Sequence, residues 1–202
     1  MTDAEHKAAV RELMRSIRAQ FPGFREAVAA DARVTALGRG ERGDFRSKAD
    51  TALQILRLMW VADAFFAQVM YRLKASLQKR EIPLLPRIAH KMAMQSAQVS
   101  IGDPVIVHPG IYIVHGQVVL DGMVEVGSNT VIMPWVTLGL RAGNVQGPAV
   151  GQGVSIGTGA KLIGPVTVGD GATIGANSVV VGDVEAGATV VGAPAKAREK
   201  SS

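Results

Sequence analysis

Few side chains in this chain of 202 residues can exchange a proton near neutral pH. The sequence holds four histidines and no cysteine, which excludes a thiol nucleophile, a disulfide and a cysteine-based metal site. His6 and His90 have no polar partner close in sequence and are expected on helix surfaces. His108 and His115 lie among short apolar runs. Two histidines do not supply the three protein ligands of a catalytic zinc site, so a zinc-dependent hydratase of the carbonic anhydrase kind is disfavoured.

The elements that must position these histidines follow from a strict sequence period of six. Neither a helix, with period 3.6, nor an alternating strand, with period 2, keeps an aliphatic residue at every sixth place. Such a repeat is typical of a solenoid whose coils are built from three short strands around an aliphatic interior. Glycines follow several of the repeated positions and fit tight corners. The repeated positions are Val150, Ile156, Leu162, Val168, Ile174 and Val180.

The same period extends towards the N-terminus with two interruptions. It holds from Ile101 through Val107 to Ile113, slips by one residue, and resumes at Val126, Ile132 and Leu138. Residues 140–148 break it with Gly, Asn and Pro, and are predicted to form a loop that leaves the prism in place of one strand. At eighteen residues a coil, residues 101–192 predict about five coils.

Helical periodicity precedes the repeat. We expect helices over residues 3–20 and 24–37, a long helix from Ser47 or Asp50 to about Arg80, and a short helix over residues 87–95. The long helix has an apolar face too broad for a lone surface helix, so it should pack on other helices or on another subunit. The expected class is α+β: a helical domain (1–97), a β-helix with a projecting loop (98–193) and a C-terminal tail (194–202).

Charge and hydropathy narrow the choice of partners. Residues 1–100 hold 17 basic and 10 acidic side chains, and the second half holds 5 and 7. Because the basic residues are interleaved with acids, we interpret them as solvated helix surfaces and expect no nucleic acid partner. The most apolar stretch is interrupted by Arg57, Asp63 and Arg72, so no transmembrane segment is expected. A polar N-terminus and the lack of cysteine fit a cytoplasmic protein.

Several segments resemble the left-handed β-helix acyltransferases, and most closely their serine O-acetyltransferase branch, which grades into acetyltransferases of exopolysaccharides. The segments are VTLG (136–139), GTGAK (157–161), IGANSVV (174–180), VGAPA (191–195) and IPLLP (82–86), and the resemblance spans roughly residues 55–196. It implies a left-handed β-helix and an acetyl-CoA-dependent O-acetyltransferase. It also implies a homotrimer, or a pair of trimers joined by the N-terminal helices.

The resemblance assigns roles to individual residues. His115 matches the family histidine that takes the proton from the acceptor hydroxyl; alternatively, it is a corner histidine that only makes hydrogen bonds. Coenzyme A lies in the family's groove between prisms, against the backbone of small residues. The positions that match this groove are Gly139, Thr158 and Ala176, and the residues expected to meet the phosphates are Lys161, Lys196 and Arg198.

Three departures from the family pattern concern the acceptor. The place of a second, loop histidine is Gly147, the acid before the first histidine is replaced by Val114, and the acid that orients the imidazole would fall near Ile106. Their absence argues against L-serine and favours a neutral hydroxyl, as in a sugar or a secondary metabolite. The polar residues left to contact such an acceptor are Arg141, Asn144, Gln146 and His108. A non-catalytic scaffold or ligand-binding module is the alternative of another class.

Overall fold

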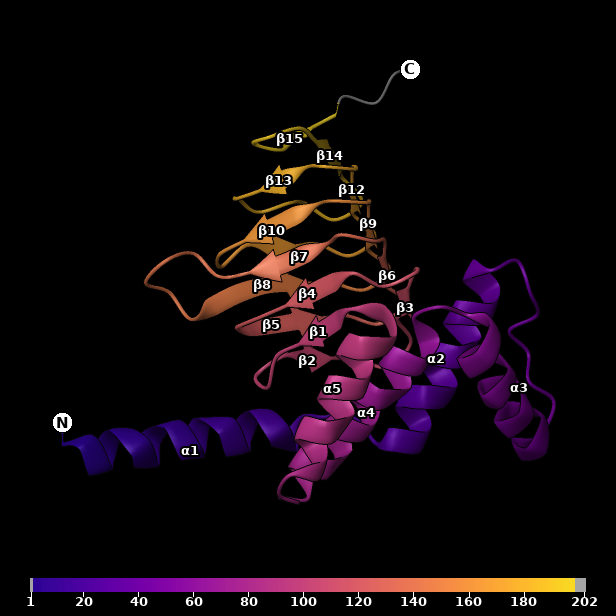
Figure 1. The fold of residues 1–202 in the computed structure, drawn as a ribbon. Coiled ribbons are helices and arrows are strands. Elements are labelled where there is room, and N and C mark those ends of the chain that lie inside the picture. The colour runs from indigo at the N-terminus through magenta and orange to yellow at the C-terminus, as the bar shows by residue number, and fades with distance from the viewer. Residues whose placement is uncertain (1, 199–202) are drawn as a thin grey trace.

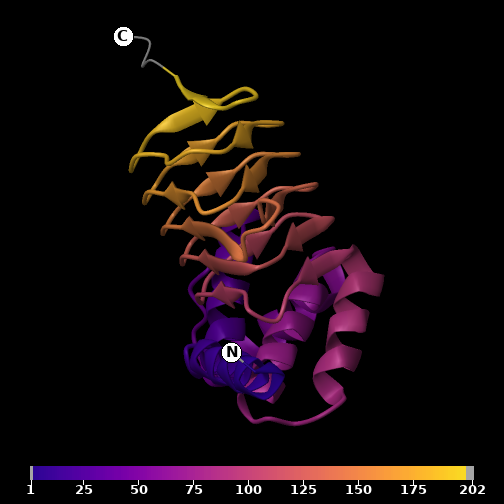
Figure 2. The same cartoon turned by 90° about the vertical axis from the view of Figure 1, so that its left-hand side faces the viewer.

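The computed structural model describes residues 2–198 and joins a helical part to a prism of short strands (Figure 1). Seen from the side, the coils of the prism stack one on another away from the helices, and the C-terminal end lies farthest from them (Figure 2). In these residues the helices are α1 (Asp3–Ala19), α2 (Phe24–Gly38), α3 (Lys48–Val61), α4 (Phe65–Lys79) and α5 (Leu85–Ala97).

The prism is built from strands of two to five residues. They are β1 (Val99–Ile101), β2 (Ile106–Val107), β3 (Tyr112–Ile113), β4 (Val118–Leu120), β5 (Met123–Val126), β6 (Val131–Ile132), β7 (Thr137–Gly139), β8 (Gln146–Val150), β9 (Ser155–Ile156), β10 (Lys161–Ile163), β11 (Thr167–Val168), β12 (Thr173–Ile174), β13 (Val179–Val180), β14 (Thr189–Val191) and β15 (Lys196–Ala197).

These strands form three sheets, which are the three faces of the prism. Face A has the order β1-β4-β7-β10-β13, face B β11-β8-β5-β2 and face C β15-β14-β12-β9-β6-β3. Strands pair in parallel from coil to coil, whereas β15 pairs antiparallel with β14. The register stacks one buried aliphatic side chain per coil on face A: Ile101, Leu120, Leu138, Leu162 and Val180. The predicted solenoid of about five coils, preceded by helices, is confirmed.

Both predicted interruptions of the period occur, one of them shorter than expected. The one-residue slip lies in the turn after β3, where His115, Gly116 and Gln117 all have positive φ, at 59°, 103° and 52°. The predicted loop over residues 140–148 is confined to residues 140–145, because Gln146 already pairs with Met123 of β5. The period could not show this, since β8 begins early and holds one extra residue, a bulge, between Gln146 and Ala149.

The single long helix expected to end near Arg80 is wrong. The chain bends by 119° between α3 and α4, and Ala62 between them has an extended backbone. The helix breaks at this point because α3 and α4 differ in how much of their surface is packed against the rest of the protein. Leu58 is the one buried residue of α3, and Trp60 is 90 % exposed, whereas most of α4 is buried. No single helix in residues 2–198 is long and apolar enough to cross a membrane; only the bent pair α3 and α4 together meets that test.

α4 closes the open end of the prism with polar side chains. The strands of the first coil would otherwise present unpaired backbone groups. Gln68 donates to the carbonyl of Ile111 at 3.1 Å and accepts from the amide of Ile113 at 3.2 Å. Tyr71 donates to Val105 at 3.2 Å, and burial raises the pKa of this tyrosine to about 12, so the hydroxyl remains a donor.

A buried ion pair joins two helices to the first coil. The guanidinium of Arg72 binds both carboxylate oxygens of Asp31, at 2.8 and 3.0 Å, and donates to the His108 carbonyl at 2.8 Å. Asp31 also accepts from the amides of Gly110 and Ile111, at 2.8 and 3.0 Å. Burial disfavours the charged guanidinium, but Asp31 outweighs this and raises the pKa of Arg72. The docking of the helices on the prism therefore depends on this pair.

Candidate functional site

His115 stands on the edge of the prism formed by the turns that join face C to face A, here called the C–A edge. The extra residue of its turn carries the side chain out of the regular corner, where it is 67 % exposed. Its Nδ1 lies 2.6 Å from Oδ2 of Asp63, which sits in the break between α3 and α4. A carboxylate on Nδ1 favours the tautomer with the proton there and leaves Nε2 free to accept another. The pair has the geometry of an oriented general base.

Asp63 is a candidate site residue that the sequence alone does not indicate. In the sequence Asp63 is only a charge that interrupts an apolar stretch, and the position expected for the orienting acid falls near Ile106, which is 9 % exposed on β2. Asp63 is 52 positions from His115 in sequence. The available signal was an acid flanked by alanines inside a helical pattern, but only the bend between the helices places it beside the prism.

The C–A edge also gathers two of the residues expected to line the coenzyme groove. Its successive turns are linked by backbone hydrogen bonds, from the Trp135 amide to Gln117 at 2.9 Å and from the Asn177 amide to Thr158 at 2.8 Å. His115, Thr158 and Ala176 therefore lie in one row. Lys161 begins the neighbouring strand β10, and its Nζ donates to the carbonyl of Trp135. A groove along this row would be lined by the imidazole of His115, by the small side chains of Thr158 and Ala176, and by the ammonium group of Lys161.

The residues of the projecting loop lie on a different edge of the same chain, between faces A and B. This A–B edge carries Gly139 at the end of β7, then Arg141 and Asn144, with Gln146 at the start of β8. Asn144 accepts from the Gln146 amide at 2.8 Å, so its side chain carbonyl is engaged within the loop. One copy of the chain thus does not bring these residues to His115.

Gly147, the place of the family's loop histidine, has no room for a side chain. It is buried within β8, and a Cβ there would lie 2.5 Å from Cγ2 of Val124. Non-bonded contacts of Cβ atoms in closely packed protein interiors are longer than 2.5 Å. A histidine at this position would therefore displace the side chain of Val124, which is buried inside the prism.

His108 and Lys196 lie apart from this row. His108 is on the third edge, between faces B and C, with Nε2 2.7 Å from Oε1 of Glu125. The pair lines a cavity of about 230 Å³ with Asp170. Lys196 belongs to β15 at the far end of face C. The expected tail over residues 194–202 includes this strand, and its residues 199–202 lie outside the described part of the chain.

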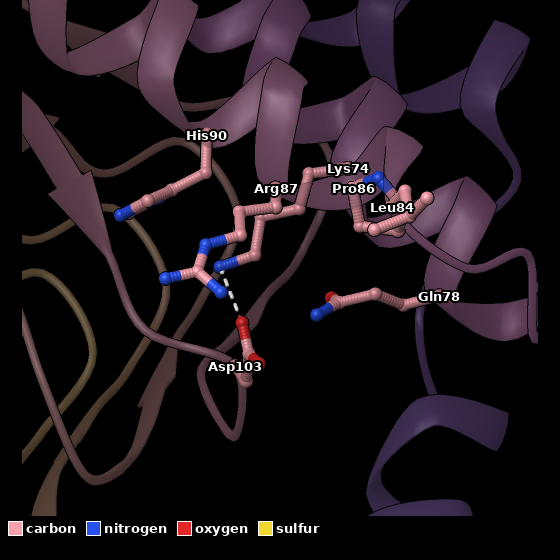
Figure 3. A pocket seen from close by; sticks show the side chains of 7 residues that line it. All are labelled: Lys74, Gln78, Leu84, Pro86, Arg87, His90 and Asp103. Atoms are coloured by element: carbon pink, nitrogen blue, oxygen red, sulfur yellow. Dashed lines mark ion pairs between the residues drawn. The ribbon is translucent and has the colours of Figure 1, made fainter.

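A separate cavity of about 360 Å³ lies between α4, α5 and the first coil (Figure 3). Within it, Nζ of Lys74 is 2.8 Å from Oδ1 of Asp103 and donates to the Ile101 carbonyl at 2.6 Å. Burial raises the pKa of Asp103, but the hydrogen bond and charge of Lys74 outweigh this and lower it. Burial, and then Lys74, also lower the pKa of His90. Asp103 is on the A–B edge, so this cavity belongs to the docking of the helices, away from His115.

Comparison with known proteins agrees with this geometry. Residues 147–182 match the family described as bacterial transferase hexapeptide (six repeats). The serine acetyltransferase of Helicobacter pylori strain J99 is 37 % identical over 134 residues, which are 64 % of this chain and 78 % of the relative. Soybean serine acetyltransferase complexed with serine has a TM-score of 0.72 at 29 % identity, covering 89 % of this chain and 71 % of the other.

A serine acetyltransferase structure from Vibrio cholerae O1 biovar El Tor N16961 has a TM-score of 0.72 at 28 % identity and covers 96 % of this chain and 73 % of its own. Similarity therefore extends over the helices as well as the prism, and it includes a curated relative of which this chain covers more than two thirds. The chain belongs to the hexapeptide-repeat serine acetyltransferase family and is an acetyl-transferring enzyme.

Proposed function

We propose that this protein transfers the acetyl group of acetyl-CoA to a hydroxyl of a small acceptor, with His115 as the general base. The observation that carries the proposal is the 2.6 Å contact between His115 Nδ1 and Asp63. It orients an exposed imidazole on the same edge as the small residues Thr158 and Ala176. The family membership makes acetyl transfer the reaction that such a base would serve.

The proposed mechanism is a direct attack. Nε2 of His115 takes the proton of the acceptor hydroxyl while the hydroxyl oxygen forms a bond to the thioester carbonyl carbon. Backbone N–H groups of the edge turns stabilise the oxyanion. The tetrahedral intermediate then breaks its C–S bond, and the departing thiolate of coenzyme A takes the proton from the imidazolium. The carboxylate of Asp63 accepts the hydrogen bond from Nδ1–H of His115 throughout and holds the ring in place.

The acetyl-CoA site is proposed along the C–A edge. Ala176 is exposed in its turn, and at the preceding turn a Cβ on Gly157 would lie 2.7 Å from the Ala176 amide, so these turns are compact. A flat edge of small residues lets a pantetheine arm approach the backbone, and Lys161 supplies a nearby cation. We further propose that a neighbouring copy in a homotrimer places its projecting loop, with Arg141 and Asn144, against this edge.

Acetyl-CoA is therefore expected to stabilise the protein. A ligand at 100 times its Kd adds about 2.7 kcal/mol to the free energy of unfolding, which a thermal melt at increasing acetyl-CoA would record as a rising Tm. Ala176→Leu should reduce this rise. Ala186→Leu, which changes an exposed alanine in a turn on the edge between faces B and C, is the matched control. An equal rise in both variants would contradict the proposed groove.

Asp63→Asn is expected to lower kcat roughly 10²- to 10⁴-fold, because the imidazole stays in place but loses the carboxylate that selects its tautomer. KM for acetyl-CoA should not change, and Asp63→Glu should recover part of kcat. The measurement is release of free thiol in the presence of the acceptor. Asp44→Asn, in the loop before α3, is the control for loss of one negative charge. A kcat within twofold of wild type in Asp63→Asn would overturn the role of this residue.

A screen of hydroxyl compounds as substrates would identify the acceptor. Serine is the compound that the relatives' names indicate, whereas Val114, Ile106 and Gly147 replace groups that the family resemblance associates with it. We propose a neutral hydroxyl compound as the acceptor. Thiol release with L-serine, simple glycosides and other small alcohols compares the two directly, and a kcat/KM highest for L-serine would refute a neutral acceptor.

A further inference from the structure

Trp135 has a backbone conformation that its side chain does not favour. It lies in the turn after β6 on the C–A edge, with φ of 66°. The matching positions in the next two coils are Gly159 and Asn177, with φ of 74° and 55°. Glycine and asparagine are the residues that adopt this left-handed region readily, and a bulky side chain there is an outlier. One coil of the edge therefore holds an aromatic residue where a small one is easier to accommodate.

This conformation is held in place from both sides. The Trp135 amide donates to Gln117 at 2.9 Å, and the Trp135 carbonyl accepts from Nζ of Lys161. The indole contributes little to the core, since the residue remains 58 % exposed. Strain that is retained without core packing in exchange is characteristic of functional positions. The exposed ring is thus better explained by a ligand than by stability.

The position of Trp135 relative to the base indicates which ligand. Gln117, to which its amide binds, is two residues after His115, so the indole stands one coil beyond the imidazole on the same edge. The turns of this edge, residues 114–117, 133–136, 157–160 and 175–178, contain no carboxylate. Asp63, which reaches the edge from the helices, is engaged by His115. An ammonium group would find no free carboxylate in these turns, whereas a flat apolar face would find an aromatic platform.

We propose that Trp135 is the acceptor platform and that the acceptor is a sugar ring, stacked on the indole so that one hydroxyl reaches Nε2 of His115. This inference rests on the proposed function and specifies its substrate class. A pyranose offers a face of C–H groups that packs on an aromatic ring and hydroxyls at its rim. A free amino acid offers no such face. Trp135 is thus a specificity-determining residue for the transfer.

Steady-state kinetics with Trp135→Gly and Trp135→Asn test the proposal, with methyl glucoside, methyl galactoside and L-serine as acceptors. Wild type should have a higher kcat/KM on a glycoside than on L-serine. Both variants should raise KM for the glycoside roughly 3- to 10-fold, with the Tm rise caused by acetyl-CoA unchanged. Their own Tm should be equal to or above that of wild type, since both residues suit positive φ. Trp60→Phe, at the 90 % exposed position on α3, is the matched control and should change neither parameter.

The fluorescence of Trp135 distinguishes a ligand contact from a merely structural role, because only a ligand contact makes its emission depend on the glycoside. The chain has two tryptophans, so in the Trp60→Phe variant Trp135 is the only indole. Titration with methyl glucoside or methyl galactoside should shift its emission and saturate near KM. Two results together would overturn the platform: unchanged emission of Trp60→Phe on titration with a glycoside, and an unchanged glycoside KM in Trp135→Gly. If thiol were still released with another acceptor, the proposed function would stand. A lower Tm with unchanged KM would also overturn it. Absence of thiol release with every acceptor, together with no stabilisation by acetyl-CoA, would overturn the proposed function and the platform with it.

Discussion

Replacing His115 with asparagine is expected to lower kcat roughly 10²- to 10⁴-fold, the usual contribution of a general base. Asparagine is the informative replacement because it tolerates positive φ, and His115 has φ of 59°. The turn then keeps its shape while the proton acceptor is lost. The measurement is thiol release at saturating acetyl-CoA and acceptor, with stabilisation by acetyl-CoA recorded separately to show that the groove remains.

His108→Asn is the matched control for this experiment. His108 also carries a carboxylate partner, Glu125 at 2.7 Å, but it lies on the edge between faces B and C. We expect its kcat to stay within twofold of wild type. If His115→Asn retained activity within threefold of wild type, His115 would be a corner histidine and the base would have to be sought elsewhere.

Asp31→Ala is expected to lower the free energy of unfolding by about 3–5 kcal/mol, the range for breaking a buried ion pair by removing one partner. The side chains of Arg72 and Asp31 are 2 % and 1 % exposed. The alanine variant leaves the guanidinium charge without its counterion and the amides of Gly110 and Ile111 without their acceptor. Urea unfolding followed by circular dichroism measures the loss, and a variant that does not fold is the extreme of the same result.

The control removes an ion pair of similar chemistry from the surface. Glu81→Ala breaks the contact between Glu81 and Arg15, whose side chains are 64 % and 74 % exposed. Exposed pairs contribute little because water and salt already screen them, so the unfolding midpoint should not move. A loss below about 1 kcal/mol in Asp31→Ala would show that the helices do not depend on this pair for their docking.

The sequence by itself determined the prism. The aliphatic period of six is a local constraint, because each coil stacks on its neighbour at the strand spacing and repeats the same three corners. For that reason the coils, the slip at His115 and the row of Thr158 and Ala176 could be predicted without coordinates. The resemblance of short motifs added the acetyl-transfer chemistry, and family comparison confirmed it.

Only the tertiary structure decided what stands beside that row. A helical pattern does not record where a chain bends, so the break at 119° between α3 and α4 was not predicted, and with it the contact of Asp63 with His115. Backbone strain leaves no pattern in a sequence, so the φ of 66° at Trp135 could not be predicted. Periodicity specifies how the chain repeats. The geometry of the site depends on long-range docking and on single residues that depart from the repeat.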